Sequence, residues 1–300
     1  MNPWIEAMRL RTLPVSLAGV VAGTACAIYH DGFSLLPFFI CLFFAVLAQI
    51  ASNFANEYYD YKNGVDRKGR EGFRRGVTEG DIDPISMKYA IYITLGLAAI
   101  IGATLIIWGG WWLIFIGMAI GLFALAYSTG PFPLSHHGLG EFAVIIFFGL
   151  VPVIFTEYVQ TRVLYLDNIT ILTSVAVGLM AANVLIVNNY RDLEDDKAVG
   201  KKTTVVIFGR KIMANIYYIN GILSAVFLAM ATSTFPFWIS AGWLSYFAFH
   251  TMLWSKLRSL SGRELNDILK WTALILFFIT IYLLIIFATL KPAFDFFSFP

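Results

Sequence analysis

The sequence predicts an all-α, polytopic membrane protein, with about nine transmembrane helices around a central cavity and a cytoplasmic amino terminus. Composition is the first reason: 59% of the 300 residues are hydrophobic and only 13% are charged. The mean hydropathy of +0.74 lies outside the range of soluble domains. The second reason is that the chain contains long stretches without charge. The third is that lysine and arginine gather in alternate connections between those stretches.

Each expected span is an apolar stretch of about 20 residues, the length that a helix needs to cross a hydrocarbon core of roughly 30 Å. Reading for such stretches favours nine spans, although the short fifth span and the tight break at Gly109-Gly110 leave eight or ten as alternatives. No connection is long enough to form a separate soluble domain, so residues 1–300 are expected to form a single domain. The expected spans are residues 13–29, 35–56, 89–108, 111–128, 142–156, 169–189, 212–232, 236–254 and 268–290.

The distribution of basic residues predicts the orientation, because lysine and arginine accumulate on the cytoplasmic side of a membrane. With the amino terminus inside, nine alternating spans place all of the 21 basic residues on that side except Arg162 and Lys291. We therefore expect a multi-pass protein of the cell inner (cytoplasmic) membrane. The net charge of +2 is uninformative, because the signal lies in the distribution of the charges and not in their total, and we expect no nucleic-acid partner.

Polar side chains mark the cytoplasmic end of the second span, in the stretch NFANEYYDYKNGVDRKGR at residues 53–70. On a helix Asn53, Asn56 and Asp60 share one face with Gln49, because successive steps of three or four residues return to the same side. A polar face at membrane depth must look into the bundle interior or a wet cavity. For this cluster alone, a solvated helix end remains the alternative.

A second stretch, NVLIVNNYRDLEDDKAVGKKT at residues 183–203, ends the sixth span in the same manner. Asn188, Asp192 and Asp196 follow one another in steps of four, and Asn189 precedes Asp192 by three. The second and sixth spans end on the same side, so both clusters face one compartment. The period of four spans between them suggests a duplicated unit, which would set the clusters opposite one another across a central cavity.

Opposed carboxylates repel one another unless cations lie between them. Oxygen ligands without Cys or His favour Mg²⁺ or Ca²⁺ over zinc. Basic residues follow each cluster and are suited to phosphate oxygens, which favours a metal-bound diphosphate. A secondary transporter with an ion site at Asp60 and Asp192 is the alternative from another class, but it is expected to carry its carboxylates near the middle of spans. The basic residues are Arg67, Lys68, Arg70, Arg74 and Arg75 after the first cluster, and Lys197, Lys201 and Lys202 after the second.

These motifs resemble those of the UbiA-type intramembrane prenyltransferases. That family carries an Asn-x-x-x-Asp cluster with a further Asp downstream and an Asp-x-x-x-Asp cluster on a later helix. Here the two clusters are Asn56, Asp60 and Asp66, and Asp192 and Asp196. Within the family the chain looks most like the branch that prenylates 1,4-dihydroxy-2-naphthoate in menaquinone synthesis. The supporting stretches are RLRTLPVSLAG (9–19), NEYYDYKNGVD (56–66), RRGVTEGDI (74–82), YSTGPFPLSHHGLGEFAVIIFFG (127–149) and NNYRDLEDDKAVGKKTTVV (188–206).

The resemblance implies that the whole chain is one prenyltransferase domain that moves a polyprenyl group from its diphosphate to dihydroxynaphthoate, with loss of CO₂, to give demethylmenaquinone. Other acceptors, namely 4-hydroxybenzoate, homogentisate or a glycerol phosphate lipid, remain alternatives. The implied catalytic residues are Asp60, Asp66, Asp192 and Asp196, and with Asn56 they would bind Mg²⁺. The implied substrate-binding residues are Asn53, Asn56, Arg75, Tyr127, Asn188, Asn189, Arg191 and Lys201.

Four further expectations concern residues around these motifs. The family commonly has Asp after the motif Asn, where this chain has Glu57, so the ligand geometry could differ. The loop after Tyr127 offers His136 and His137 in place of the Lys of some branches, and we expect both histidines to be solvated. The loop over residues 66–84 is expected to close over the site as a lid. Arg11 is expected to bind the acceptor carboxylate, with an ordinary positive-inside anchor as the alternative.

Overall fold

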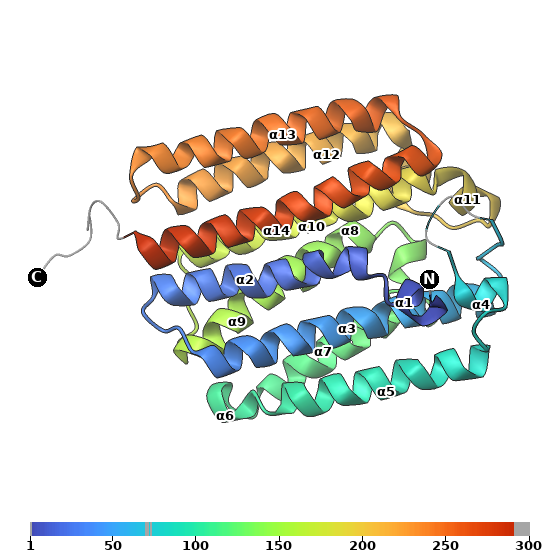
Figure 1. Ribbon diagram of the computed structural model, residues 1–300, viewed down its shortest axis with the longest axis horizontal. Coiled ribbons are helices and arrows are strands. Elements are labelled where there is room, and N and C mark those ends of the chain that lie inside the picture. Colours follow the sequence, from blue (N-terminus) through green and yellow to red (C-terminus); the bar gives the residue numbers. More distant parts are fainter. Residues whose placement is uncertain (1, 70–71, 73, 291–300) are drawn as a thin grey trace, which may run out of the picture.

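The computed structural model describes residues 2–69, 72 and 74–290, and its regular structure in these ranges is helical. The long helices lie lengthwise beside one another in one bundle (Figure 1). In the part of the chain that the structure describes, seven helical segments are long and apolar enough to cross a membrane. The long helices are α2 (Leu13–Tyr29), α3 (Leu35–Lys62), α5 (Pro84–Ala103), α7 (Leu113–Ala126), α9 (Val151–Thr161), α10 (Asn168–Arg191), α12 (Thr204–Ala231), α13 (Ser240–Ser259) and α14 (Leu265–Thr289).

Shorter elements extend or connect these helices. The helix α6 (Ile106–Gly109) follows α5, and α8 (Gly140–Val144) continues through a π-helical segment, η3 (Ile145–Leu150), into α9. The remaining elements lie in connections: α1 (Pro3–Met8), η1 (Leu10–Thr12), α4 (Gly76–Glu79), η2 (Leu134–His136), α11 (Leu193–Ala198), η4 (Phe237–Ile239) and η5 (Gly262–Glu264).

Each expected span coincides with helical structure in the described ranges, which confirms the all-α membrane fold. The helix α3 continues beyond its expected end at residue 56, so that Asp60 belongs to the helix. The short α7 and the more polar α13 are not among the seven segments that satisfy both length and hydropathy. The count of nine spans and the side of the amino terminus therefore stay predictions. Lys291 lies outside the described residues.

The backbones of η3 and α10 cross in direct contact at Gly149. A Cβ atom added at Gly149 would lie 2.5 Å from the Cα of Gly178 and 2.5 Å from the carbonyl oxygen of Ser174. Small residues permit this approach, and between membrane helices the gain comes from van der Waals packing of the close backbones. The crossing fixes α10, whose last turn carries the second polar cluster, against the middle of the bundle.

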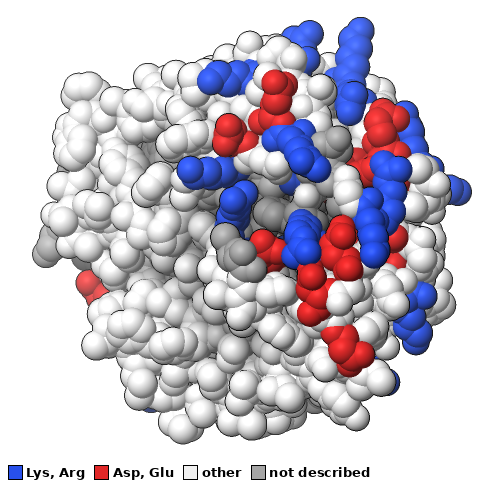
Figure 2. All heavy atoms as spheres, turned by 45° about the vertical axis from the view of Figure 1, so that its right-hand side comes forward, with Lys and Arg blue, Asp and Glu red and all other residues white. Residues whose placement is uncertain are grey.

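The two polar clusters meet at one end of the bundle, which we call the polar end. It is the right-hand end in Figure 1, where α3 and α10 terminate and where α1, α4 and α11 lie. Acidic and basic side chains gather over this end, whereas most of the surface around it is uncharged (Figure 2). The prediction that the second and sixth spans end on the same side is confirmed.

A compact polar cluster lies at the opposite end of the bundle and joins α2, α9 and α10. His30, directly after α2, contacts Glu157 of α9 through Nδ1 at 2.6 Å and Asp167, before α10, through Nε2 at 3.0 Å. Tyr165 stacks on the imidazole at a centroid distance of 3.7 Å. Burial alone would lower the pKa of His30, but hydrogen bonds with Asp167 and Glu157 outweigh it and raise this pKa to about 9. At neutral pH the cluster therefore holds an imidazolium between two acidic side chains.

We expect this cluster to give the protein a pH-dependent stability. The pKa of His30 rises from an ordinary 6.5 to about 9 on folding, so its contribution is complete below pH 6.5 and is lost as the pH rises through 9. The melting temperature of the wild type in detergent should fall by about 2–4 °C more than that of His30→Gln between pH 6.5 and pH 9.5. Parallel pH profiles for the two proteins would contradict this assignment.

Candidate active site

The first polar cluster is built from the last turns of α3 and from the loop that follows. Arg75, 5% exposed, lies at its centre. Its Nη2 donates a hydrogen bond of 2.8 Å to Oδ1 of Asn56 and lies 3.5 Å from Oδ2 of Asp60, while its Nε lies 3.5 Å from Oδ2 of Asp66. Asp66 also accepts a hydrogen bond of 2.9 Å from the hydroxyl of Thr78. One buried guanidinium thus gathers all three polar residues of the first motif.

The second cluster forms where α10 ends and the chain turns into α11. Arg191 places Nε at 2.7 Å and Nη2 at 2.9 Å from the two carboxylate oxygens of Asp192, in a forked pair. The same guanidinium donates to Asn188 and, across the bundle, to Asn266 of α14, both at 2.8 Å. Asp192 and Asp196 are both buried. The contacts of Arg191 therefore hold the carboxylate of Asp192 in a fixed orientation.

The two clusters face one another across a small polar cavity of about 30 Å³. Lys201, in the loop after α11, reaches across the gap and places Nζ at 3.9 Å from Oδ2 of Asp60. Tyr127, directly after α7, lines the same cavity, where its phenolic hydroxyl can donate a hydrogen bond. The residues that line this cavity are Arg9, Asn56, Arg75, Tyr127, Ser135, Leu185, Asn188, Asn189, Asp192, Asp196 and Lys201.

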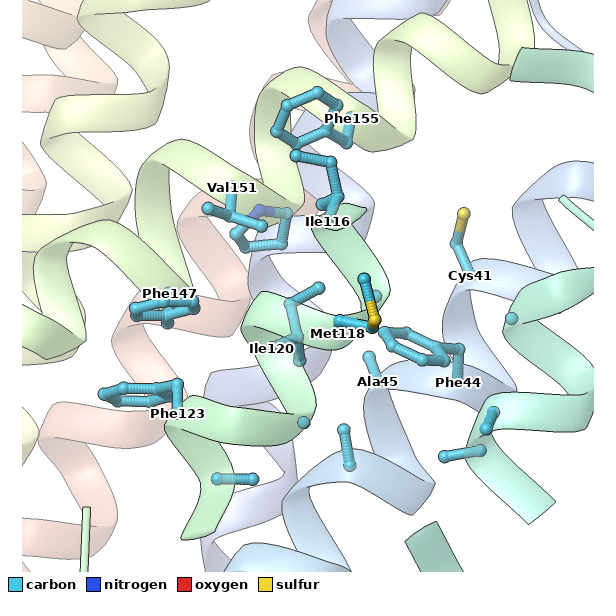
Figure 3. A pocket seen from close by; sticks show the side chains of 18 of the residues that line it. Cys41, Phe44, Ala45, Ile116, Met118, Ile120, Phe123, Phe147, Val151 and Phe155 are labelled. Carbon is cyan, nitrogen blue, oxygen red and sulfur yellow. The ribbon is translucent and has the colours of Figure 1, made fainter. Parts of the chain in front are cut away.

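A much larger apolar cavity of about 740 Å³ lies within the amino-terminal half of the bundle. Its walls come from α2, α3, α5, α6, α7, η3 and α9, and they include Phe44, Phe123, Phe147 and Phe155 (Figure 3). The lining residue nearest to the polar cluster along α3 is Ser52, one helical turn before Asn56. An apolar space thus begins beside a charged one, as a ligand with a charged head and a hydrocarbon tail requires.

Acidic and basic side chains thus lie close together at the polar end of a bundle of apolar helices. A profile of the UbiA prenyltransferase family matches residues 16–282. The chain belongs to this family. Its resemblance to the family, read from the two motifs, is therefore confirmed.

Two bacterial relatives illustrate where the chain lies within the UbiA family. It is 35% identical over 249 residues to the 1,4-dihydroxy-2-naphthoate octaprenyltransferase of Escherichia coli (strain K12), covering 80% of this chain and 79% of the relative. It is 33% identical over 248 residues to the protein of the same name from Haemophilus influenzae, covering 79% of this chain and 80% of the relative.

Solved structures of UbiA homologs share the fold. A homolog from Archaeoglobus fulgidus bound to DMAPP and Mg²⁺ superposes with a TM-score of 0.65 at 17% identity, over 93% of this chain and 99% of that one. The apo structure of a homolog from Aeropyrum pernix K1 gives a TM-score of 0.68 at 13% identity, over 90% and 96% of the two chains. These likenesses confirm the expected polytopic helical architecture.

Most of the expected site residues of this UbiA protein come together, but two of the expected substrate-binding residues point elsewhere. Asn53 donates a hydrogen bond of 2.9 Å to the carbonyl of Met8 and so holds the amino-terminal segment. Arg11 is exposed and is not among the residues that line the polar cavity. Asn189 lines the cavity and donates a hydrogen bond of 2.9 Å to Glu141, so its amide is oriented by a half-buried carboxyl group.

The expectation that both histidines are solvated is wrong for His136. Its Nε2 lies 3.6 Å from Oδ1 of Asp60, and its side chain is only 14% exposed. A backbone hydrogen bond of 3.2 Å from Lys202 to the carbonyl of His136 ties the two loops together, which brings the imidazole inward. His137 is exposed and stacks on Phe132, as a surface residue would. No sequence signal separates the two, because a tertiary contact selects one of them.

The loop after the first cluster approaches the second cluster. Arg67 forms an ion pair with Asp195, and a Cβ at Gly72 would lie 2.7 Å from Nη2 of Arg191. Glu57, where the family commonly has Asp, accepts a hydrogen bond of 3.1 Å from the backbone of Val77 and holds the loop down. Arg70 lies outside the described residues, as do residues 71 and 73. Closure of this loop as a lid stays a prediction.

The donor set of the site fits Mg²⁺ chemically. Asn56, Asp60 and Asp66 on one side and Asp192 and Asp196 on the other supply oxygen donors only, as this ion prefers. Among the residues that the structure describes, no three Asp, Glu, His or Cys side chains already converge at metal-binding distance. Instead the cationic groups of Arg75 and Lys201 lie beside the carboxylate of Asp60.

Proposed function

We propose that this protein transfers a polyprenyl group from prenyl diphosphate to 1,4-dihydroxy-2-naphthoate, with loss of CO₂ and release of diphosphate, and so forms the quinol (reduced) form of demethylmenaquinone. One observation carries the proposal: two carboxylate clusters face one another across a polar cavity, and the lining of a large apolar cavity begins one helical turn away along α3. The naphthoate octaprenyltransferases to which the chain is 33–35% identical support the acceptor.

The polar cavity suits the diphosphate head of the donor. Arg75 and Lys201 approach Asp60 from opposite clusters, and we assign both to the phosphate oxygens once the substrate is present. Mg²⁺ bound by Asn56, Asp60, Asp66, Asp192 and Asp196 would neutralise the charge of the leaving diphosphate. Arg191 is committed to Asp192, Asn188 and Asn266, so we assign it the role of holding Asp192 in place.

The prenyl chain is assigned to the apolar cavity between α3, α5, α7 and α9. The bond between the allylic carbon and the diphosphate oxygen breaks, and its electron pair leaves with the diphosphate. The ring carbon that bears the carboxylate then forms a new bond to the allylic carbon, and CO₂ leaves while its bonding electrons return to the ring. Protein side chains that exclude water protect the cationic carbon, because hydrolysis would compete with transfer.

We place the protein in the cell inner membrane with the polar end facing the cytoplasm. The basic residues support this, since nearly all of them lie in the segments that nine spans would put inside. UbiA-type transfer to 4-hydroxybenzoate, homogentisate or a glycerol phosphate lipid is the alternative for the acceptor. A secondary transporter is disfavoured because the carboxylates lie at the end of the bundle, beside basic loops.

Product mass tests the proposal directly. The purified protein in detergent, with a prenyl diphosphate and Mg²⁺, should convert dihydroxynaphthoate into a product that is heavier by the prenyl group and lighter by CO₂. The three alternative acceptors should give no product under the same conditions, and EDTA should abolish turnover until Mg²⁺ is restored in excess. Efficient prenylation of another acceptor, with none of dihydroxynaphthoate, would overturn the assignment.

A further inference from the structure

The segment before α2 brings an arginine into the polar cavity that neither motif contains. Arg9 lines the cavity, and its Nη2 donates a hydrogen bond of 3.1 Å to Oδ1 of Asn56. The Nη2 of Arg75 donates to the same oxygen at 2.8 Å. Two guanidinium groups therefore share one neutral acceptor.

The backbone at Arg9 is held in an unusual conformation that aims this side chain. Its φ of 51° and ψ of 56° lie in the left-handed region, which is unfavourable for a residue that carries a Cβ. Thr12 secures the turn with two hydrogen bonds to the carbonyl of Arg9, from its backbone nitrogen at 2.8 Å and from its hydroxyl at 2.9 Å. Asn53 of α3 binds the preceding carbonyl, that of Met8, at 2.9 Å. Asn53, which belongs to the polar face of α3, therefore contacts this turn.

The acceptor requires a cation separate from those that hold the diphosphate. Arg75 and Lys201 lie beside Asp60, whereas Arg9 enters from the amino-terminal segment and donates its hydrogen bond to Asn56. The carboxylate of the acceptor must lie close to the reacting allylic carbon, because the ring carbon that bears it forms the new bond. A forked guanidinium binds a carboxylate with two parallel hydrogen bonds.

Resting on the proposed function, we infer that Arg9 binds the carboxylate of the aromatic acceptor and selects acceptors that carry one. Asn53 is a positioning residue for the turn that presents it. Arg11 lies two residues away on the exposed side of η1, so it serves as the matched control.

Steady-state kinetics of Arg9→Gln and Arg11→Gln with Mg²⁺ and prenyl diphosphate test the inference. Arg9→Gln should raise the KM for dihydroxynaphthoate about 10- to 100-fold, the size of a charge-assisted pair of hydrogen bonds, and leave the KM for prenyl diphosphate within about two-fold. Arg11→Gln should change neither. With 1,4-dihydroxynaphthalene, which lacks the carboxylate, the wild type and Arg9→Gln should react at the same rate.

A second variant separates the side chain from the turn. Glycine adopts the left-handed conformation without strain, so Arg9→Gly should keep the wild-type melting temperature and show the same rise in acceptor KM. Equal effects on both substrates, an effect on prenyl diphosphate alone, or no effect would each overturn the role of Arg9. If the wild type itself makes no product from dihydroxynaphthoate, the proposed function fails, and these outcomes remain distinct.

Discussion

Asp192→Asn is expected to reduce kcat/KM for prenyl transfer by about 10³-fold or more, and to lower the melting temperature as well. The substitution removes a negative charge from the buried polar cavity to which we assign the diphosphate, and electrostatic contributions to catalysis are largest in such a cavity. The amide keeps the shape of the side chain, and Arg191 retains its hydrogen bonds to Asn188 and Asn266. The buried guanidinium nevertheless loses the carboxylate of Asp192, which lowers the stability of the fold. Asp60→Asn should have a similar effect, because it is the corresponding carboxylate of the first cluster.

Turnover at saturating Mg²⁺ and the melting temperature, measured on the same preparations, check this prediction. Glu194→Gln is the matched control, since Glu194 is an exposed carboxylate on the same short helix as Asp196. It should retain activity within about two-fold. Activity of Asp192→Asn within three-fold of the wild type would contradict the assignment of the two carboxylate clusters as the active site.

Gly149→Ala is expected to destabilise the folded protein by at least about 2 kcal/mol. The new methyl group would lie 2.5 Å from backbone atoms of α10, and neither backbone can rotate away as a side chain can. The helices must separate, which loses packing along η3 and α10 and moves the helix that carries Asp192. We therefore expect a lower melting temperature and reduced activity together.

Gly96→Ala is the control for this effect. Gly96 lies on α5, where no atom is within 4 Å of an added Cβ, and alanine is a better helix former than glycine by up to about 1 kcal/mol. Its melting temperature should equal or exceed that of the wild type. Equal melting temperatures for Gly149→Ala and Gly96→Ala would show that the crossing tolerates a larger separation.

The sequence by itself determined the membrane class, the helical architecture and the fact that the two clusters lie at the same end of the bundle. These properties depend on the hydropathy and the charge of each segment. Both are local properties of the sequence, and they determine directly which segments enter the hydrocarbon core. The motif spacing likewise placed Asn56 and Asp60 on one face of α3, because helical periodicity alone sets that relation.

Only the tertiary structure decided which other side chains reach the cavity. Arg9 and Arg11 are equivalent in sequence terms, but the left-handed turn at Arg9, held by Thr12 and Asn53, sends only the first of them to the site. His136 and His137 are likewise adjacent, and a backbone contact with Lys202 brings only His136 to Asp60. Such outcomes depend on contacts between segments that are distant in the chain, so no local pattern of residue types encodes them.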